Sequence, residues 1–286
     1  MPKIKLVLAD IDGTLLPFGE SVVRDRTLAA VHALREAGIA FGPSSGRERC
    51  DLVQFFHGDE SCLTTGIMGN GKVVYLDDAP VYRRPLPKEA LRKIIEAVSG
   101  RRGIVMTCYR PLDERGRSQQ GFYGMGLCEG ERELFARVTG EAFAAGVRTD
   151  PPEGDVTTAA IVLDTSQVSI AEAQQLLSSA CPDMDFPQSA PFVIDVLEHG
   201  WTKLSALPIL LDHLQVTIDE VMYLGDSAND LTMMEAIPNS VCMGNGTDEA
   251  KAVARWVVDT CDNDGAARVM ESLAAHGGEL VPEEWC

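Results

Sequence analysis

Short apolar runs alternate with longer segments of helical periodicity through most of the chain. Residues 4–9 are apolar except for Lys5, which predicts a buried strand. A helix is predicted over residues 24–37. Leu28, Val31 and Leu34 share its apolar face. Strands that alternate with helices in this way are typical of βαβ units, so the sequence predicts an α/β fold with a doubly wound, mostly parallel sheet.

The same alternation returns in the last third of the chain. Strands are predicted there at residues 193–197, 221–224, 241–243 and 256–258, and helices at residues 202–214 and from about residue 248. Nearer the N-terminus, residues 39–42 predict a second strand, and Asn70-Gly71 is typical of a hairpin turn. The two outer parts of the chain therefore share the same alternation of predicted strands and helices.

The middle of the chain, residues 84–189, has a different pattern. Its segments are shorter, and prolines interrupt them at positions 85, 87, 111, 151, 152, 182 and 187. Residues 83–117 hold ten Lys or Arg against four Asp or Glu, a local charge of +6. Both changes predict an inserted domain. The chain would then divide into a first core part at 1–83, the insertion at 84–189 and a second core part at 190–286.

Composition and charge narrow the classes of function. The chain has 286 residues, of which 45% are hydrophobic, and a formal net charge of −18. So acidic a protein repels nucleic acids and anionic membranes, and neither is an expected partner. Its eight cysteines include no C-x-x-C pair and no cluster with histidine, which favours reduced thiols over a disulfide framework or a zinc site. No apolar stretch is long enough for a signal peptide or a membrane span, so we expect a cytoplasmic protein.

Polar side chains follow the ends of several predicted strands. They are Asp10 and Asp12 after the first strand, Ser44 and Ser45 after the second, and Asp226, Asn229 and Asp230 after the strand at 221–224. Lys203 stands at the start of a predicted helix. Because the carboxyl ends of parallel strands share one edge of a sheet, we expect these side chains to gather at one rim.

Each of these motifs has an ordinary structural reading when it is taken alone. Asp12-Gly13 is typical of a tight turn, Asp226 of a helix cap and Lys203 of a surface lysine. An EF-hand loop is excluded, because Thr and Leu residues follow where further acidic ligands are needed. Four coincidences at four loops are jointly improbable, which favours a shared chemical site.

The residue types at this rim fit phosphoryl transfer. Asp10 and Asp12 are two residues apart on an extended strand end, so their side chains face the same way. Crowded carboxylates need a cation, and Mg²⁺ prefers oxygen ligands. With Asp10 as nucleophile, hydrolysis would pass through an aspartyl-phosphate, and Asp12 would act as general acid and base. Lys203 would offset the charge of the phosphoryl oxygens.

These motifs resemble those of the haloacid dehalogenase (HAD) superfamily of aspartate-nucleophile phosphotransferases. The matching stretches are D-x-D-G-T at 10–14, Ser-Gly-Arg at 45–47, Lys203, and G-D-x-x-N-D at 225–230. The stretches MGNG, DEAKAVARWVV and NDGAARVM in the last part of the chain look like the Cof-type branch with a class IIB cap. This resemblance implies a Rossmann-like core that carries an inserted α+β cap domain.

The resemblance also implies a role for each matching residue. Asp10 is similar to the nucleophile and Asp12 to the acid and base. The positions that match substrate-binding residues are Ser45, Gly46, Arg47, Lys203 and Asn229, and those that match metal ligands for Mg²⁺ are Asp10, Asp12 through its backbone, Asp226 and Asp230. Two departures stand out: Ser45 replaces the usual Thr, and Leu204 replaces the Gly that usually follows the lysine.

The sequence therefore predicts a Mg²⁺-dependent phosphatase whose partner is a small phosphorylated metabolite, such as a sugar phosphate. Two alternatives stay open at this stage. The G-W-T-K stretch at 200–203 is similar to phosphomannomutase relatives, which keeps a phosphomutase open. The other alternative is a non-catalytic phospho-accepting or binding protein on the same scaffold, although no nucleophile or metal-ligand position is missing.

Overall fold

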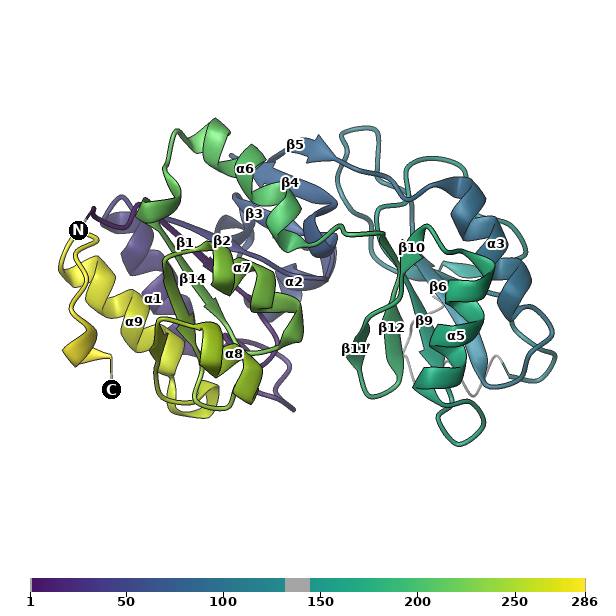
Figure 1. The fold of residues 1–286 in the computed structure, drawn as a ribbon. Helices are drawn as coiled ribbons and strands as arrows, with labels where there is room; N and C mark the ends of the chain where they lie inside the picture. Colours follow the sequence, from purple (N-terminus) through teal and green to yellow (C-terminus); the bar gives the residue numbers. More distant parts are fainter. Residues whose placement is uncertain (1, 132–144, 286) are drawn as a thin grey trace. The chain divides into compact units, whose positions relative to one another are not determined.

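The computed structural model describes residues 2–131 and 145–285, and the chain forms two compact units. The first unit combines Met1–Tyr82 with Thr202–Cys286, and the second unit is Arg83–Trp201 (Figure 1). The predicted α/β fold is confirmed, since the first unit is built on a parallel sheet flanked by helices.

The sheet of the first unit has five strands in the order β16-β15-β14-β1-β2, and all neighbours are parallel. The strands are β1 (Leu6–Ala9), β2 (Ala40–Pro43), β14 (Val221–Gly225), β15 (Asn239–Cys242) and β16 (Trp256–Val257). In the register, Leu6 lies opposite both Val221 and Ala40. The central strand β1 is therefore paired on one side with a strand from the far end of the chain.

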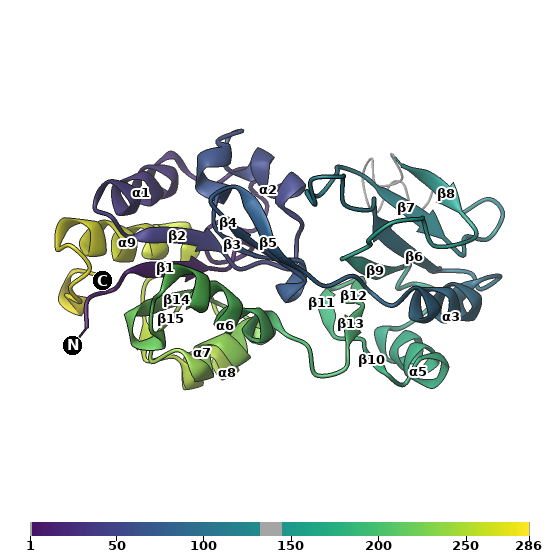
Figure 2. The same ribbon diagram turned by 90° about the horizontal axis from the view of Figure 1, so that it is seen from above.

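Helices cover both faces of this sheet (Figure 2). One face carries α1 (Asp25–Glu36) and α9 (Gly265–Ala275), and the other carries α6 (Lys203–Leu214), α7 (Leu231–Ala236) and α8 (Asp248–Val253). Because side chains alternate along a strand, Val7 of β1 packs in the α1/α9 cluster, while Leu8 packs in the α6/α7 cluster. Burial on both faces explains why this strand is a continuous apolar run.

A smaller sheet lies within the first unit, in the order β3-β4-β5. Its strands are β3 (Gly66–Met68), β4 (Val73–Leu76) and β5 (Ala79–Arg83), and they follow the short helix α2 (Arg49–Phe55). β3 and β4 are antiparallel, and Asn70 in the turn between them has a φ of 54°. This left-handed conformation suits Asn, and the predicted hairpin turn at Asn70-Gly71 is confirmed.

The second unit is built on a six-stranded sheet in the order β11-β12-β9-β6-β7-β8. The strands are β6 (Ile104–Tyr109), β7 (Phe122–Met125), β8 (Gly146–Arg148), β9 (Ala159–Leu163), β11 (Gln188–Ala190) and β12 (Val193–Asp195), and a separate pair is formed by β10 (Met184–Asp185) and β13 (Leu197–Glu198). The helices α3 (Lys88–Val98) and α5 (Ile170–Ala180) pack with this sheet in one apolar cluster. Among the described strands of this sheet, only β7 and β8 pair in parallel, so the sheet is mostly antiparallel, unlike the parallel sheet of the first unit.

The second boundary between the units differs from the predicted one. The sequence analysis began the second core part at residue 190 and counted residues 193–197 with its strands. In the structure, β12 (Val193–Asp195) pairs with β9 of the second unit, and that unit continues to Trp201. A short apolar run does not reveal which strand it will pair with, and the proline at 187 lies before three further strands rather than at a linker.

Among residues 2–131 and 145–285, no helix is both long enough and apolar enough to cross a bilayer.

Candidate active site

Three neighbouring strands of the first unit deliver polar residues to one edge of the sheet. Asp10 directly follows β1, Ser44 follows β2 and Asp226 follows β14. β1 lies between the other two strands and pairs with both in parallel, so the three strand ends are adjacent. The shared rim predicted from the sequence is therefore present in the fold.

A buried ammonium joins residues from three separate segments at this rim. Nζ of Lys203, at the start of α6, donates to Oδ1 of Asp10 at 2.6 Å and to Oδ1 of Asp230 at 2.7 Å. Lys203 is 1% exposed and Asp230 is fully buried. The ion pairs raise the pKa of Lys203 well above its ordinary value, although burial alone would lower it. Lys203 is thus held as a cation.

Asp230 uses both of its carboxylate oxygens within the protein. Oδ1 accepts from Lys203 and from the hydroxyl of Tyr223 at 2.6 Å. Oδ2 accepts from the backbone N–H groups of Asp226 and Ser227, at 3.0 and 3.1 Å. Asp230 therefore fixes both the lysine and the loop after β14. Through these contacts, the carboxylate holds other groups of the site in position.

Three carboxylates crowd together beside this lysine. Asp10, Asp226 and Asp230 each offer one oxygen, and the three oxygens lie within 4.8 Å of one another. Burial raises the pKa of Asp10 well above its ordinary value; the Lys203 ammonium opposes that rise, and the other two carboxylates add to it. Three acidic groups around one ammonium leave an excess of negative charge, so the cluster has the donor set for a metal cation.

Asp226 is held close against the loop that follows β1. The hydroxyl of Thr14 donates to Oδ1 of Asp226 at 3.2 Å. A Cβ at Gly13, whose φ is +83°, would lie 2.5 Å from Oδ2 of Asp226, so only glycine fits there. Burial, followed by the charge of Asp230, raises the pKa of Asp226 to about 7.

Asp12 has different surroundings from Asp10, although it is only two residues away. Its side chain is 41% exposed and forms a two-point ion pair with Arg47. The distances are 2.8 Å from Nε to Oδ2 and 3.0 Å from the guanidinium to Oδ1. The guanidinium also lies over the ring of Phe55, at 5.0 Å from its centroid. The predicted residues Asp12 and Arg47 therefore bind each other at the rim.

The remaining predicted residues divide into buried and exposed positions. Ser45 is 2% exposed, and its hydroxyl accepts from the backbone N–H of Arg47 at 3.2 Å. A Cβ at Gly46 would lie 3.1 Å from the side chain of Asn70, so the loop passes close to the β3–β4 turn. Asn229 is exposed and accepts from the hydroxyl of Ser227 at 2.9 Å. Asn229 therefore stays outside the buried cluster.

Three residues at the site were missed in the sequence analysis. Tyr223 supports Asp230, Thr14 supports Asp226, and Asn245 donates to the backbone O of Gly13 at 2.8 Å. Thr14 lies within the D-x-D-G-T motif and Asn245 within the MGNG stretch, so these motifs could have identified both residues. Tyr223 lies inside an apolar strand, where an aromatic residue indicates only packing.

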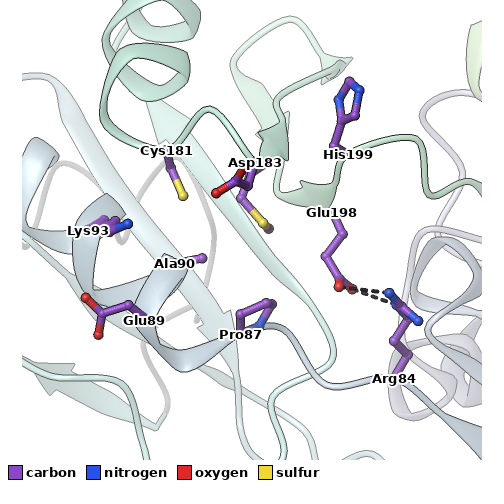
Figure 3. A pocket seen from close by; sticks show the side chains of 10 residues that line it. Arg84, Pro87, Glu89, Ala90, Lys93, Cys181, Asp183, Glu198 and His199 are labelled. Atoms are coloured by element: carbon purple, nitrogen blue, oxygen red, sulfur yellow. Dashed lines mark hydrogen bonds and ion pairs between the residues drawn. The ribbon is translucent and has the colours of Figure 1, made fainter.

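A separate pocket lies within the second unit, between α3 and the β10/β13 pair (Figure 3). Arg84 and Glu198 face each other at one end, with Nε and Oε2 at 2.8 Å. Glu89, Lys93 and Asp183 also line it. None of the predicted site residues lies there, and its charges are mixed, so this pocket has no preference for an anion.

The comparisons with known proteins agree with this geometry. The model of the haloacid dehalogenase-like hydrolase family matches residues 7–270. The chain belongs to this family. The predicted HAD relationship and the prediction of a hydrolase-type enzyme are therefore confirmed.

Several relatives in this family carry more specific names. The chain is 28% identical over 258 residues to the HMP-PP phosphatase of Klebsiella pneumoniae, covering 87% of each chain. It is 26% identical over 273 residues to the 5-amino-6-(5-phospho-D-ribitylamino)uracil phosphatase YitU of Bacillus subtilis, covering 93% of this chain and 96% of YitU. The structure of the HAD subclass IIB sugar phosphatase BT4131 matches with a TM-score of 0.72 at 19% identity, over 94% of this chain and 98% of that one.

The raised pKa of Asp226 predicts a cost in stability. Because the pKa is about 7 in the folded protein and 3.8 ordinarily, folding favours the protonated acid. Asp226 therefore destabilises the metal-free fold increasingly as the pH rises from about 4 to about 7. With EDTA present, Asp226→Asn should raise the Tm over wild type, and this gain should be at least about 3 °C larger at pH 8 than at pH 5.

The matched control is Asp212→Asn, which neutralises an exposed carboxylate on α6. Its effect on Tm should be small at both pH values. Thermal unfolding followed by circular dichroism measures all three proteins. An equal gain for Asp226→Asn at both pH values would show that the folded protein does not hold this carboxyl in its protonated form.

Proposed function

We propose that the chain is a Mg²⁺-dependent phosphatase that hydrolyses small phosphorylated metabolites through an aspartyl-phosphate on Asp10. One observation carries this proposal: the ammonium of Lys203 lies 2.6 Å from Oδ1 of Asp10 at the carboxyl edge of a parallel sheet. A carboxylate beside a fixed cation at such an edge suits attack on an anionic phosphoryl group.

Asp10 is the nucleophile in this proposal. Its carboxylate oxygen forms a bond to phosphorus, and the bond between phosphorus and the leaving alcohol oxygen breaks. Lys203 orients Asp10 and offsets the negative charge that accumulates on the phosphoryl oxygens. Water then attacks the phosphorus, which releases inorganic phosphate and restores the carboxylate of Asp10.

Asp12 is the proton carrier in this proposal. It gives a proton to the leaving alcohol oxygen in the first step and takes one from the attacking water in the second. Its half-exposed side chain stands on the same strand end as Asp10, which supports this role. Arg47 binds Asp12 in the resting protein and is the group that we expect to release it when a phosphate arrives.

The carboxylate cluster fits the divalent cation that the resemblance implies. Oxygen ligands suit Mg²⁺. Burial raises the pKa of Asp226, the charge of Asp230 adds to this rise, and a cation would neutralise that charge. In our proposal Asp10 and Asp226 hold the ion with the backbone carbonyl of Asp12. Asp230, predicted as a ligand, remains close by as the group that orients Lys203. A bound Mg²⁺ would supply charge neutralisation for the phosphate dianion.

The relatives support the substrate class. HMP-PP phosphatase and YitU are both named for small phosphorylated compounds, and each matches 87% or more of this chain. We propose that the second unit acts as the cap that selects the substrate. Several basic residues in its run at 83–117 are already paired, such as Arg84 with Glu198 and Arg117 with Asp113. Arg110 follows β6 and is exposed, which makes it the candidate for contact with substrate.

Substitution of the nucleophile tests the proposal directly. Asp10→Asn keeps the shape of the side chain but removes the attacking charge, so kcat for p-nitrophenyl phosphate should fall at least ~10³-fold. Phosphate release and thermal unfolding are measured together, with Asp212→Asn as a folded, active control. Hydrolysis near the wild-type rate by a folded Asp10→Asn protein would refute the covalent mechanism. A wild-type protein that transfers phosphate between sugars and releases none would instead indicate the phosphomutase.

Metal removal tests the role of the carboxylates. EDTA should abolish phosphate release and added Mg²⁺ should restore it, because the cluster without a cation repels phosphate. Asp226→Ala should weaken Mg²⁺ binding in calorimetry at least about tenfold, while Ser45→Ala should change it less than about threefold. Equal Mg²⁺ affinity in wild type and Asp226→Ala would remove Asp226 from the ligand set.

Neutralising Arg110 tests the cap. Arg110→Gln should raise KM for the best natural substrate about fivefold, the loss of one charged contact of ~1 kcal/mol. The kcat for p-nitrophenyl phosphate should stay unchanged. Arg92→Gln is the matched control, since Arg92 lies in the same basic run but pairs with Glu89 at 3.6 Å. If both variants leave KM unchanged, the basic run is a solvated surface.

A further inference from the structure

Three side chains of types that bind metals lie close together in the first unit, and none of them belongs to the candidate active site. His32 lies on α1, Asp59 precedes a short 3₁₀ segment (Glu60–Leu63), and Cys62 lies within that segment. Each side chain offers one ligand atom, and the three atoms lie within 4.8 Å of one another. Nitrogen, oxygen and sulfur donors from two parts of the chain thus lie close together.

The donors are held in place by contacts of their own. Oδ1 of Asp59 accepts from the backbone N–H of Ser61 at 2.9 Å, which fixes the carboxylate as the cap of the 3₁₀ segment. Oδ2 then lies 2.9 Å from Nε2 of His32. The hydrogen bonds to Ser61 lower the pKa of Asp59, so this group is a carboxylate at neutral pH. One anionic oxygen is therefore already directed at the imidazole.

The cluster is buried on one side and open on the other. Cys62 is 1% exposed and packs in the apolar core with the α1/α9 side of the sheet. The side chains of His32 and Asp59 are 40% and 30% exposed. An ion could therefore reach the thiol past the two polar side chains and keep water as a further ligand.

We propose that His32, Asp59 and Cys62 form a second metal site, which binds a divalent transition metal ion of the zinc type. A thiolate, an imidazole and a carboxylate match the ligands of Zn²⁺, and a water molecule would complete a tetrahedron. Mg²⁺ prefers oxygen ligands alone, so the site differs in metal preference from the carboxylate cluster at Asp10.

The charged groups around the Cys62 thiol affect how a metal ion would bind to it. Burial raises the pKa of Cys62 to about 12, so the metal-free thiol is protonated. Binding would release that proton to the solvent as the sulfur–metal bond forms. The carboxylate of Asp59 attracts the ion, and the nearby Arg35 opposes it while favouring the thiolate. A bound ion would tie α1 to the 3₁₀ segment and stabilise the first unit.

A cobalt titration tests this site. Co²⁺ substitutes for Zn²⁺ and reports thiolate ligation by a charge-transfer absorption band. With excess Mg²⁺ present to occupy the carboxylate cluster, the full chain should bind one equivalent of Co²⁺ with this band. Cys62→Ser should lose the band, and His32→Ala should weaken binding at least about 100-fold, since loss of a direct ligand exceeds loss of a supporting residue. Cys50→Ser, at a half-buried cysteine outside the cluster, should keep the band and the affinity.

The thermal stability provides the second measurement. One equivalent of Zn²⁺ should raise the Tm of wild type and of Cys50→Ser, but not that of His32→Ala, which retains the core thiol. Phosphate release with Mg²⁺ should be the same in all of these proteins, so this test is separate from that of the phosphatase. Absence of a thiolate–cobalt band in wild type, or a band that persists in Cys62→Ser, would overturn the proposal. The cluster would then be an ion pair beside a core cysteine.

Discussion

The buried ammonium of Lys203 is the constraint on which the rest of the site depends. It lies between Asp10 and Asp230, and all three groups are shielded from water. Removal of one partner from such an arrangement leaves an unpaired buried charge, at a cost of about 3–5 kcal/mol. The parallel order of β14, β1 and β2, the start of α6 and the support of Tyr223 all serve this contact. The same arrangement leaves more carboxylates than ammonium groups at the rim, and this imbalance favours the binding of a metal cation.

Much of this arrangement could be predicted from the sequence, because its signals are local. The alternation of apolar runs and helical periods gave the parallel sheet of the first unit. Asp10, Asp226 and Asp230 stood out because they follow apolar strands, and the resemblance of D-x-D-G-T and G-D-x-x-N-D to the HAD motifs implied their roles. The glycine of the first motif has a physical reason in the structure, since a Cβ at Gly13 would collide with Asp226.

What could not be predicted depends on partners that are distant in the chain. Nothing near Asp12 indicates that Arg47 binds it, and Tyr223 reads as an ordinary core residue until its hydroxyl is seen against Asp230. The strand at Val193–Asp195 was assigned to the wrong sheet, because an apolar run does not indicate which strand it will pair with. The helix α9, which packs directly on α1, was not predicted, although Val269, Met270 and Leu273 recur in it at helical spacing; here the sequence held a local signal that was missed.

The interrupted first unit also sets an order of events during synthesis of the chain. β1 pairs with β14, so Leu6 cannot pair with its partner Val221 until Val221 has left the ribosome. At a synthesis rate of 5–20 residues per second, that interval is roughly 10 to 40 seconds. The second unit, Arg83–Trp201, is continuous and emerges whole before the first can close its sheet. Lys203 follows Asp10 by 193 residues, so a nascent chain has no assembled site until Lys203 and Asp230 have left the ribosome.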